Sequence, residues 1–165
     1  MPLVVVIGKY LQMYPEINLE RLYRYVEQTL EVVCEAPFVM LYVHSEASYS
    51  ENCPGVLWLR RLYNRLPESV RLNLSSFLVL HCNWSLWLTL LAVCPYFLRD
   101  FWGKVKYFSR IELLEEAIQG TLELPQFVLD HDALLEEQPL ADYGVYTHRD
   151  DIARAEGSAP PPAVL

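Results

Sequence analysis

Hydrophobic residues are spaced in two ways along this chain, and the two patterns alternate. Short continuous apolar runs, rich in β-branched and aromatic residues, are typical of strands that are buried on both faces. They occur at residues 3–7, 38–44, 75–81 and 104–108. Between these runs, apolar residues recur every three or four positions, which predicts helices. The helical segments are expected at residues 18–33, 54–66, 84–94 and 109–119.

Residues typical of helix ends support these boundaries. Asn18 is a suitable N-cap, and Pro54 suits the first turn of the second helix. Pro95 is expected to end the third helix, which is so apolar on all sides that burial or partial membrane contact is predicted. Ser109 begins a capping-box pattern for the fourth helix, and Gly120 is placed as its C-cap glycine.

The alternation of strands and helices predicts a layered α/β domain with a mainly parallel sheet, because parallel neighbours need crossover connections. The chain of 165 residues is long enough for one such domain. We expect the domain to occupy residues 1–135. Residues 136–165 lose the periodicity, are acidic and rich in proline, and are expected to form a disordered tail.

Charge is distributed unevenly over the sequence, whose formal net charge is −8. From Asp130 to the end, eight acidic residues face two arginines. Between Arg60 and Arg110 the sign reverses, with eight basic residues against two acidic ones. This basic stretch predicts contact with an acidic protein surface or an anionic membrane surface, although a solvated face is the simpler alternative. Nucleic acid is not expected as a partner, because an acidic chain repels a polyanion.

Targeting and redox features predict a cytoplasmic protein that is either free or peripheral to a membrane. The chain has no signal-peptide pattern at its start, and its cysteines lack metal-binding spacing, so we expect reduced thiols and no metal. The uncharged run from Phe77 to Leu98 is long enough to span a bilayer. We regard a transmembrane helix as the alternative for this run, because His81 and Pro95 interrupt it and its first part has a strand-like context.

No residue pattern predicts catalysis or a cofactor. His44 and His81 follow adjacent strands, where the sites of α/β domains gather, so a hydrolase is a third interpretation. There is no nucleophile elbow and no glycine-rich phosphate loop. The segment Asp130–Asp132 contains a histidine between two aspartates, but it is interpreted as a solvated terminal turn. Cys53 precedes Pro54 and is interpreted as a packing residue.

A set of aromatic residues around Pro95 is the most distinctive feature of the sequence. Two interpretations stay open for these residues. They form either a buried core, or a surface element that serves as a lid over an apolar cavity or as an edge that touches the membrane interface. The predicted gate and cavity residues are Trp84, Trp87, Phe97, Phe101 and Trp102.

The order of the motifs resembles that of the divergent CRAL-TRIO, or BCH, family over about residues 3–132. The resemblance is carried by VVVIGK, LYVHSE, WLRRLYNRL, NLSSFLVLHCNW and LAVCPYFLRDFWGKVKYF, at residues 4–9, 41–46, 58–66, 73–84 and 91–108. It implies an α/β domain with an apolar cavity roofed by a gate helix, here about Tyr96 to Trp102. Members of the wider family bind hydrophobic ligands, and BCH members act as scaffolds for small GTPases, for GTPase regulators and for each other.

The resemblance implies a non-catalytic binding module, and two functions follow from it. The first is a scaffold that binds a small GTPase or its regulator, with a homo-oligomer as a further possibility. It is favoured because no helical segment precedes the first strand, unlike in the lipid-transfer branch. The alternative is binding or transfer of a hydrophobic ligand or phospholipid. The predicted basic face for the partner or headgroup comprises Arg60, Arg61, Arg65, Lys104 and Lys106.

Overall fold

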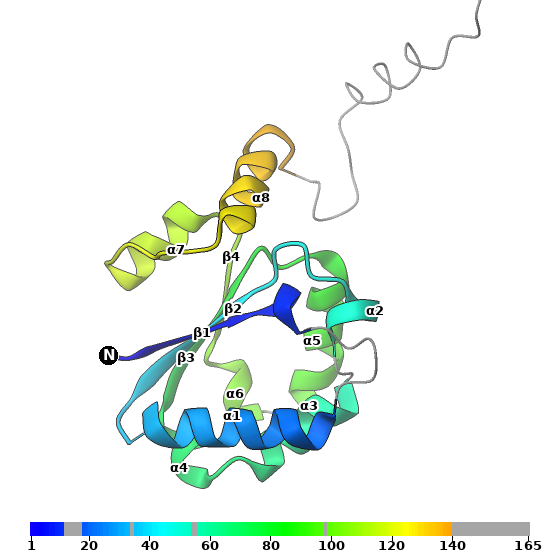
Figure 1. The fold of residues 1–165 in the computed structure, drawn as a ribbon, viewed down its shortest axis with the longest axis vertical. Coiled ribbons are helices and arrows are strands. Elements are labelled where there is room, and N and C mark those ends of the chain that lie inside the picture. Colours follow the sequence, from blue (N-terminus) through cyan, green and yellow to red (C-terminus); the bar gives the residue numbers. More distant parts are fainter. Residues whose placement is uncertain (12–17, 34, 54–55, 98, 140–165) are drawn as a thin grey trace, which may run out of the picture.

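The computed structural model describes residues 1–11, 18–33, 35–53, 56–97 and 99–139, and its architecture is α/β. Helices flank a four-stranded sheet (Figure 1). In chain order the elements are β1 (Leu3–Ile7), the 3₁₀ turn η1 (Gly8–Tyr10), α1 (Leu19–Val33), β2 (Phe38–Val43), α2 (Tyr49–Asn52), α3 (Val56–Arg65), α4 (Glu68–Asn73), β3 (Leu74–Leu80), α5 (Trp84–Phe97), α6 (Arg99–Trp102), β4 (Val105–Phe108), α7 (Ile111–Ile118) and α8 (Gln126–Glu137).

All four strands are parallel and lie in the order β1-β2-β3-β4. This arrangement confirms the predicted layered α/β fold. Leu3 aligns with Val39 at one end of the first pair, and Ile7 aligns with Val43 at the other. Because the strands are parallel, the residues that follow β2 and β3 lie together at the carboxyl ends of the strands, close to α8.

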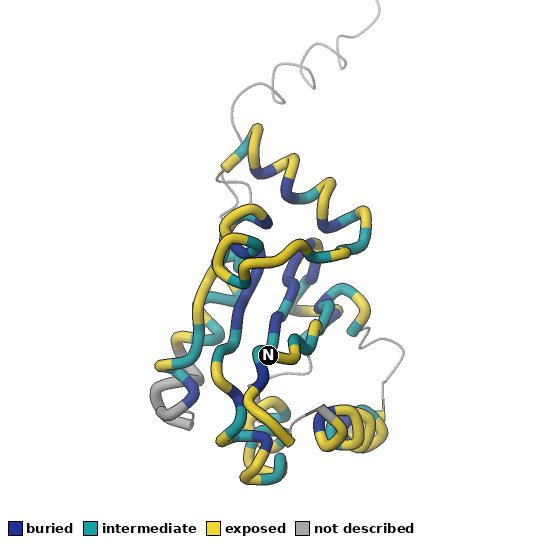
Figure 2. The backbone as a smooth tube through the Cα atoms, turned by 90° about the vertical axis from the view of Figure 1, so that its left-hand side faces the viewer, coloured by how far each residue is buried: buried dark blue, intermediate teal, exposed yellow. Residues whose placement is uncertain are grey.

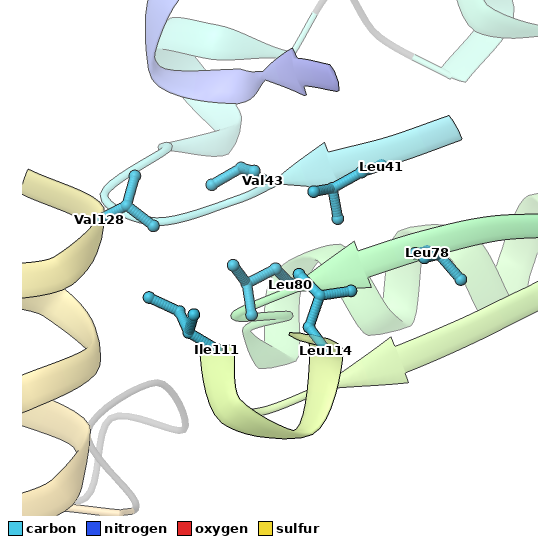
Figure 3. Close-up of a cluster of buried hydrophobic side chains, with 7 residues drawn as sticks. All are labelled: Leu41, Val43, Leu78, Leu80, Ile111, Leu114 and Val128. Carbon is cyan, nitrogen blue, oxygen red and sulfur yellow. The ribbon is translucent and has the colours of Figure 1, made fainter. Parts of the chain in front are cut away.

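The two faces of the sheet bury separate hydrophobic clusters. On one face, the first cluster has the buried members Leu30, Phe38, Val70, Leu74 and Phe101. On the other face, α7 and α8 cover the second cluster, which Figure 3 shows between the strand ends and the two helices. Its buried members are Leu41, Val43, Leu78, Leu80, Ile111, Leu114 and Val128. Burial is concentrated in the central strands, while the outer helices are largely exposed (Figure 2).

Local sequence signals placed several elements correctly. The first strand and the first helix occupy the residues that were predicted, and the Asn18 side chain accepts hydrogen bonds from the backbone N–H groups of Glu20 and Arg21 at 3.1 and 3.0 Å. Asn18 is therefore confirmed as the N-cap of α1.

One expectation about helices was wrong, and two short helices were not expected. Helix α2 lies within residues 45–52, and α4 follows Pro67. The predicted end at Pro95 was wrong, because the third helix continues two residues past it, although a proline removes one helical hydrogen bond.

The capping of α7 also differs from the expectation. Its N-cap is Arg110, without a side-chain cap, and Asp132 of α8 accepts the hydrogen bond of the Ile111 backbone N–H instead. At the other end, Gln119 rather than Gly120 has the left-handed conformation, with φ of 54°. Packing against α8 therefore replaces the predicted local cap.

The first strand is less buried than predicted. None of its residues is fully buried, and Val5 is 41% exposed, whereas Phe38, Leu41 and Val43 in β2 are 0% exposed. The reason is its position at the edge of the sheet, which a local apolar pattern does not reveal.

The long uncharged run is divided between two elements. Phe77 to Leu80 lie in β3, and α5 begins only at Trp84. None of the helices in the described residues has the length and hydrophobicity needed to span a bilayer.

Candidate functional site

Helix α3 carries three of the five predicted basic residues, and the structure separates their roles. The guanidinium of Arg65 donates two hydrogen bonds to the Glu20 carboxylate, at 3.0 and 3.1 Å, and lies 3.8 Å from the centre of the Tyr23 ring. The hydrogen bond from Arg65 lowers the pKa of Glu20. Arg65 therefore joins α3 to α1. All three arginines of this helix have exposed side chains.

The outer face of α3 combines these arginines with apolar and amide side chains. Leu57, Arg60, Arg61 and Asn64 follow the spacing of neighbours on one helix face, and all four are exposed. Leu57 has 66% of its surface exposed. No acidic residue occurs in α3. We call these four residues the α3 surface.

The other two predicted basic residues lie on β4. Lys104, just before the strand, donates a hydrogen bond to the Arg71 carbonyl at 3.2 Å, and Lys106 is exposed within the strand. The five residues of the predicted basic face are therefore divided between a helix and the edge strand of the sheet.

The predicted gate and cavity residues differ in burial. Phe101 is buried, with its ring 5.0 Å from that of Phe77 and 5.8 Å from that of Tyr63, and Trp102 is half-buried against the same cluster. Trp84 and Trp87 stack on each other at 5.1 Å, and Trp84 is 52% exposed. The side chain of Phe97 lies outside the described residues.

Helix α5 presents an exposed apolar row. Trp84, Leu88 and Leu91 follow helical spacing and are 52%, 43% and 40% exposed. Helix α5 lies against α3, so both exposed faces belong to the same region of the domain.

A buried polar network lies at the carboxyl ends of β2 and β3. His81, directly after β3, has its Nδ1 atom 2.7 Å from the Ser45 hydroxyl and its Nε2 atom 2.9 Å from the Asp132 carboxylate. Asp132 also accepts hydrogen bonds from the Ile111 backbone N–H at 2.9 Å and from the Arg110 guanidinium at 3.1 and 3.2 Å. The network joins the sheet to α7 and α8.

The hydrogen bonds favour the ionised form of Asp132. Burial opposes ionisation of Asp132, but hydrogen bonds from His81, Ile111 and Arg110 outweigh it and hold the pKa of the carboxyl below its ordinary value. Because the ionised carboxylate only accepts hydrogen bonds, His81 donates through Nε2, and in the neutral ring Nδ1 accepts a hydrogen bond from the Ser45 hydroxyl. The network thus satisfies a buried imidazole and a carboxylate together.

This network contains the residue types of a hydrolytic triad, but its geometry does not present a nucleophile. Ser45 and His81 are 0% and 1% exposed. A substrate carbonyl cannot approach the Ser45 hydroxyl in this conformation, because catalysis requires access to the nucleophile. His44 points elsewhere, with Nδ1 at 3.2 Å from the Tyr42 hydroxyl. The contacts support a structural role for the network.

The described surface contains clefts and no metal cluster. Two clefts, of about 230 and 380 Å³, are open to solvent. The larger one lies beside Arg110 and is lined by both polar and apolar side chains. Among the described residues, no group of three His, Cys, Asp or Glu side chains could hold a metal ion.

The family of the chain follows from a comparison with family models. The model described as "Divergent CRAL/TRIO domain" matches residues 1–134, which include every element of the sheet and most of α8. The chain belongs to the divergent CRAL/TRIO family. The resemblance that the sequence motifs indicated is thereby confirmed.

Curated relatives of this divergent CRAL/TRIO chain are longer proteins. It is 29% identical to protein prune homolog 2 of Xenopus tropicalis over 126 residues, covering 74% of this chain and 40% of that protein. It is 28% identical to mouse caytaxin over 115 residues, covering 69% and 31%. It is 27% identical to the Rho GTPase-activating protein gacY of Dictyostelium discoideum over 131 residues, covering 78% and 18%. The chain spans less than half of the length of each.

Sequence reasoning missed the polar network of this CRAL/TRIO domain. The expectation of a solvated terminal turn at Asp130–Asp132 was wrong, because Asp132 is buried within α8. A signal was present, since Val128, Asp132 and Leu135 follow helical spacing and all face the core. A carboxylate in an apolar row indicates a buried partner, which here is His81.

Proposed function

We propose that this chain is a non-catalytic protein-binding module that recruits a small GTPase or a GTPase regulator through the α3 surface. Divergent CRAL/TRIO domains are typically non-catalytic binding domains. One relative of this chain is by name a Rho GTPase-activating protein, which supports a partner from GTPase signalling.

The observation that carries the proposal is the composition of the α3 surface. Arg60 and Arg61 lie beside Leu57 on an exposed helix face that lacks acidic residues. Arginine contributes strongly to interfaces when its guanidinium pairs with carboxylates and its stem packs on apolar groups. The complementary partner surface carries acidic residues around an apolar contact, and opposite charge accelerates encounter.

Charge reversal at two arginines tests the proposal. Purified full-length chain is immobilised and exposed to Rho-family GTPases in both nucleotide states and to their regulators, with binding measured by interferometry. We expect Arg60→Glu with Arg61→Glu to weaken the detected interaction at least about tenfold, because two attractive contacts become repulsive. Arg65 is left intact, since it holds Glu20 and Tyr23.

Single substitutions provide a matched comparison. Arg61→Glu is expected to weaken binding, whereas Lys106→Glu, which makes the same charge change on exposed β4, leaves it unchanged. The proposal is refuted if no member of this panel binds, or if binding survives the double reversal. The chain could instead bind phosphatidylserine vesicles through the same arginines and bind none of the proteins. That outcome would refute the protein partner and indicate an anionic membrane.

Ligand carriage is a second candidate, and the exposed row of Trp84, Leu88 and Leu91 on α5 favours it. An apolar row of this kind is suited to a lipid or a membrane interface. In this function Phe97, Phe101 and Trp102 would gate an apolar cavity. Native mass spectrometry of the purified chain tests it, since a stoichiometric copurifying lipid supports carriage and a ligand-free folded chain contradicts it.

A further inference from the structure

Strand β4 ends the sheet on the side opposite β1, and within the described ranges it forms a ladder with β3 alone. A strand edge carries backbone N–H and C=O groups that can pair with another strand. Two hydrogen bonds show how β4 is oriented. The Lys104 carbonyl accepts a hydrogen bond from the Phe77 backbone N–H at 2.8 Å. The Phe108 carbonyl accepts one from the His81 backbone N–H at 3.0 Å, so both carbonyls face β3.

The alternation of the backbone identifies the groups that point outward. Successive residues of a strand direct their N–H and C=O groups to opposite sides. Lys106 therefore faces β3, whereas Val105, Tyr107 and Ser109 face away from it. Tyr107 also has an exposed side chain. The outer edge of β4 thus presents the backbone groups of three residues to an incoming strand.

The cleft beside Arg110 adjoins this edge at its carboxyl end. Its lining includes Tyr107 and Phe108 of β4, Leu135 of α8 and Pro139. Pro139 is the last of the described residues, so the chain leaves the described part of the domain beside the carboxyl end of β4. Figure 1 shows α8 beyond this end of the strand. A segment that turns back after Pro139 therefore runs along β4 in the opposite direction.

The sequence that follows Pro139 includes a segment suited to a strand. Residues 143–147 read YGVYT, and tyrosine, valine and threonine all favour strands. The connection from Pro139 to Tyr143 reaches about 13 Å when extended. This is well beyond the spacing of about 4.8 Å between neighbouring strands. Because the connection is short, the effective concentration of the segment at the edge is on the order of millimolar.

Charge favours contact between this segment and β4. Residues 103–110 include two lysines and an arginine and no acidic residue. Asp150 and Asp151 follow the YGVYT sequence, in the acidic part of the chain. A segment that passes along β4 therefore brings these carboxylates towards Lys104 and Lys106. This attraction adds to the pairing of backbone groups.

We propose that residues 143–147 add to the outer edge of β4 as a fifth, antiparallel strand, with Val145 opposite Tyr107. The odd-numbered residues of the segment then lie opposite the three outward residues of β4. Directly opposed residues of this kind exchange both backbone hydrogen bonds. The segment covers the β4 edge and the adjoining cleft, so another strand reaches this edge only by displacing it.

The side chains are complementary in the same register. The central pair joins a β-branched residue to an aromatic residue, a combination that stabilises sheets. Gly144 lies opposite Phe108, whose ring can cover a glycine of the neighbouring strand. Tyr146 lies opposite Lys106, which places an aromatic ring beside an exposed ammonium group.

Amide exchange in the full-length chain tests the pairing. Residue-resolved exchange of ¹⁵N-labelled protein is measured by NMR at a low and a high protein concentration, together with mass from light scattering. We expect the Tyr107 amide to be protected equally at both concentrations, because the segment belongs to the same chain. The Lys106 amide is the internal control, since it faces β3 and is protected with or without a fifth strand.

The register has its own test. In an antiparallel pair, opposed residues whose backbone groups point away from each other have Cα atoms about 4.5 Å apart. Gly144 and Phe108 form one such pair, and Tyr146 and Lys106 form another. We expect nuclear Overhauser effects between the α-protons of each pair.

A proline substitution in the segment gives an independent test. Val145→Pro removes the N–H that donates to the Tyr107 carbonyl and places a ring against β4. We expect exchange of the Tyr107 amide to accelerate at least about tenfold. Val164→Pro is the matched control, because it makes the same change outside the segment and is expected to leave this exchange rate unchanged. Circular dichroism verifies that both variants are folded.

The possible outcomes separate this segment from other occupants of the edge. Protection of Tyr107 that is independent of concentration, and is lost in Val145→Pro but not in Val164→Pro, supports the pairing. Protection that rises with concentration indicates a second copy of the chain and overturns it. Equal exchange in the natural chain and Val145→Pro, or the absence of both α-proton contacts, also overturns it.

Discussion

Truncation of Asp132 tests whether the buried polar network holds α7 and α8 on the sheet. Asp132→Ala removes the acceptor of His81 Nε2, the Ile111 backbone N–H and the Arg110 guanidinium. The helix itself is little affected, because alanine has the highest helix propensity. The expected effect therefore comes from the partners that are left behind.

The magnitude follows from the burial of those partners. The His81 side chain is 0% exposed, and the hydrogen bond to the Ile111 N–H is buried, so neither donor can turn to water. Each buried donor without an acceptor costs about 1–3 kcal/mol. Arg110 is partly exposed and its guanidinium can be hydrated instead, so the loss of its ion pair with Asp132 adds little to the change in stability. We expect the free energy of unfolding to fall by about 3–4 kcal/mol, a large part of a typical domain's stability.

Urea unfolding followed by circular dichroism measures this change, and Asp130→Ala is the matched control. Asp130 lies in the same helix, is exposed, and accepts a hydrogen bond from the Gln126 side-chain amide at 2.9 Å. Its removal is expected to cost less than about 0.5 kcal/mol, as for most surface substitutions. A loss below about 1 kcal/mol for Asp132→Ala would contradict the assigned role of the network.

Two further predictions concern acid stability and the close approach of Gly8, in η1, to Tyr42 of β2. Because the pKa of Asp132 is lowered in the folded state, the ionised carboxylate contributes to the free energy of unfolding. This contribution is complete above the ordinary pKa of about 4 and is lost as the pH falls through the folded-state pKa. Urea unfolding between pH 6 and 2 is expected to show the loss in the natural chain and not in Asp132→Asn. Gly8→Ala is expected to lower the free energy of unfolding by about 1–3 kcal/mol, because the new Cβ would lie 2.5 Å from the Tyr42 hydroxyl oxygen. Gly103→Ala is the control, since its Cβ would have no atom within 4 Å and no steric clash is expected. Equal thermal midpoints for the two variants would refute this prediction.

The positions of strands and helices could be predicted because their signals are local. Leu3–Ile7 is a continuous aliphatic run, and the apolar positions of Leu19–Val33 repeat with the helical period. Asn18 caps a helix whose first turn follows it directly. The alternation of such segments was sufficient to predict a parallel α/β sheet and, together with the order of motifs, the family.

The candidate surfaces could be predicted only in part. Arg60, Arg61 and Arg65 were correctly placed on one helix, but the pairing of Arg65 with Glu20 joins residues 45 positions apart and has no local signature. The interpretation of Phe101 stayed open between core and lid, because an aromatic residue looks the same in sequence whether other rings cover it or not. Its contacts with Phe77 and Tyr63 come from separate elements.

The sequence by itself determined the four strands, the helices α1, α3, α5 and α7 between and after them, the parallel sheet and the family, since periodicity and capping depend on residues a few positions apart. Only the tertiary structure decided which strand lies at the edge, that Arg65 pairs with Glu20, and that Asp132 meets His81 from 51 positions away. Burial and hydrogen bonding depend on what lies across the interface between elements, and that neighbour is not encoded near the residue itself.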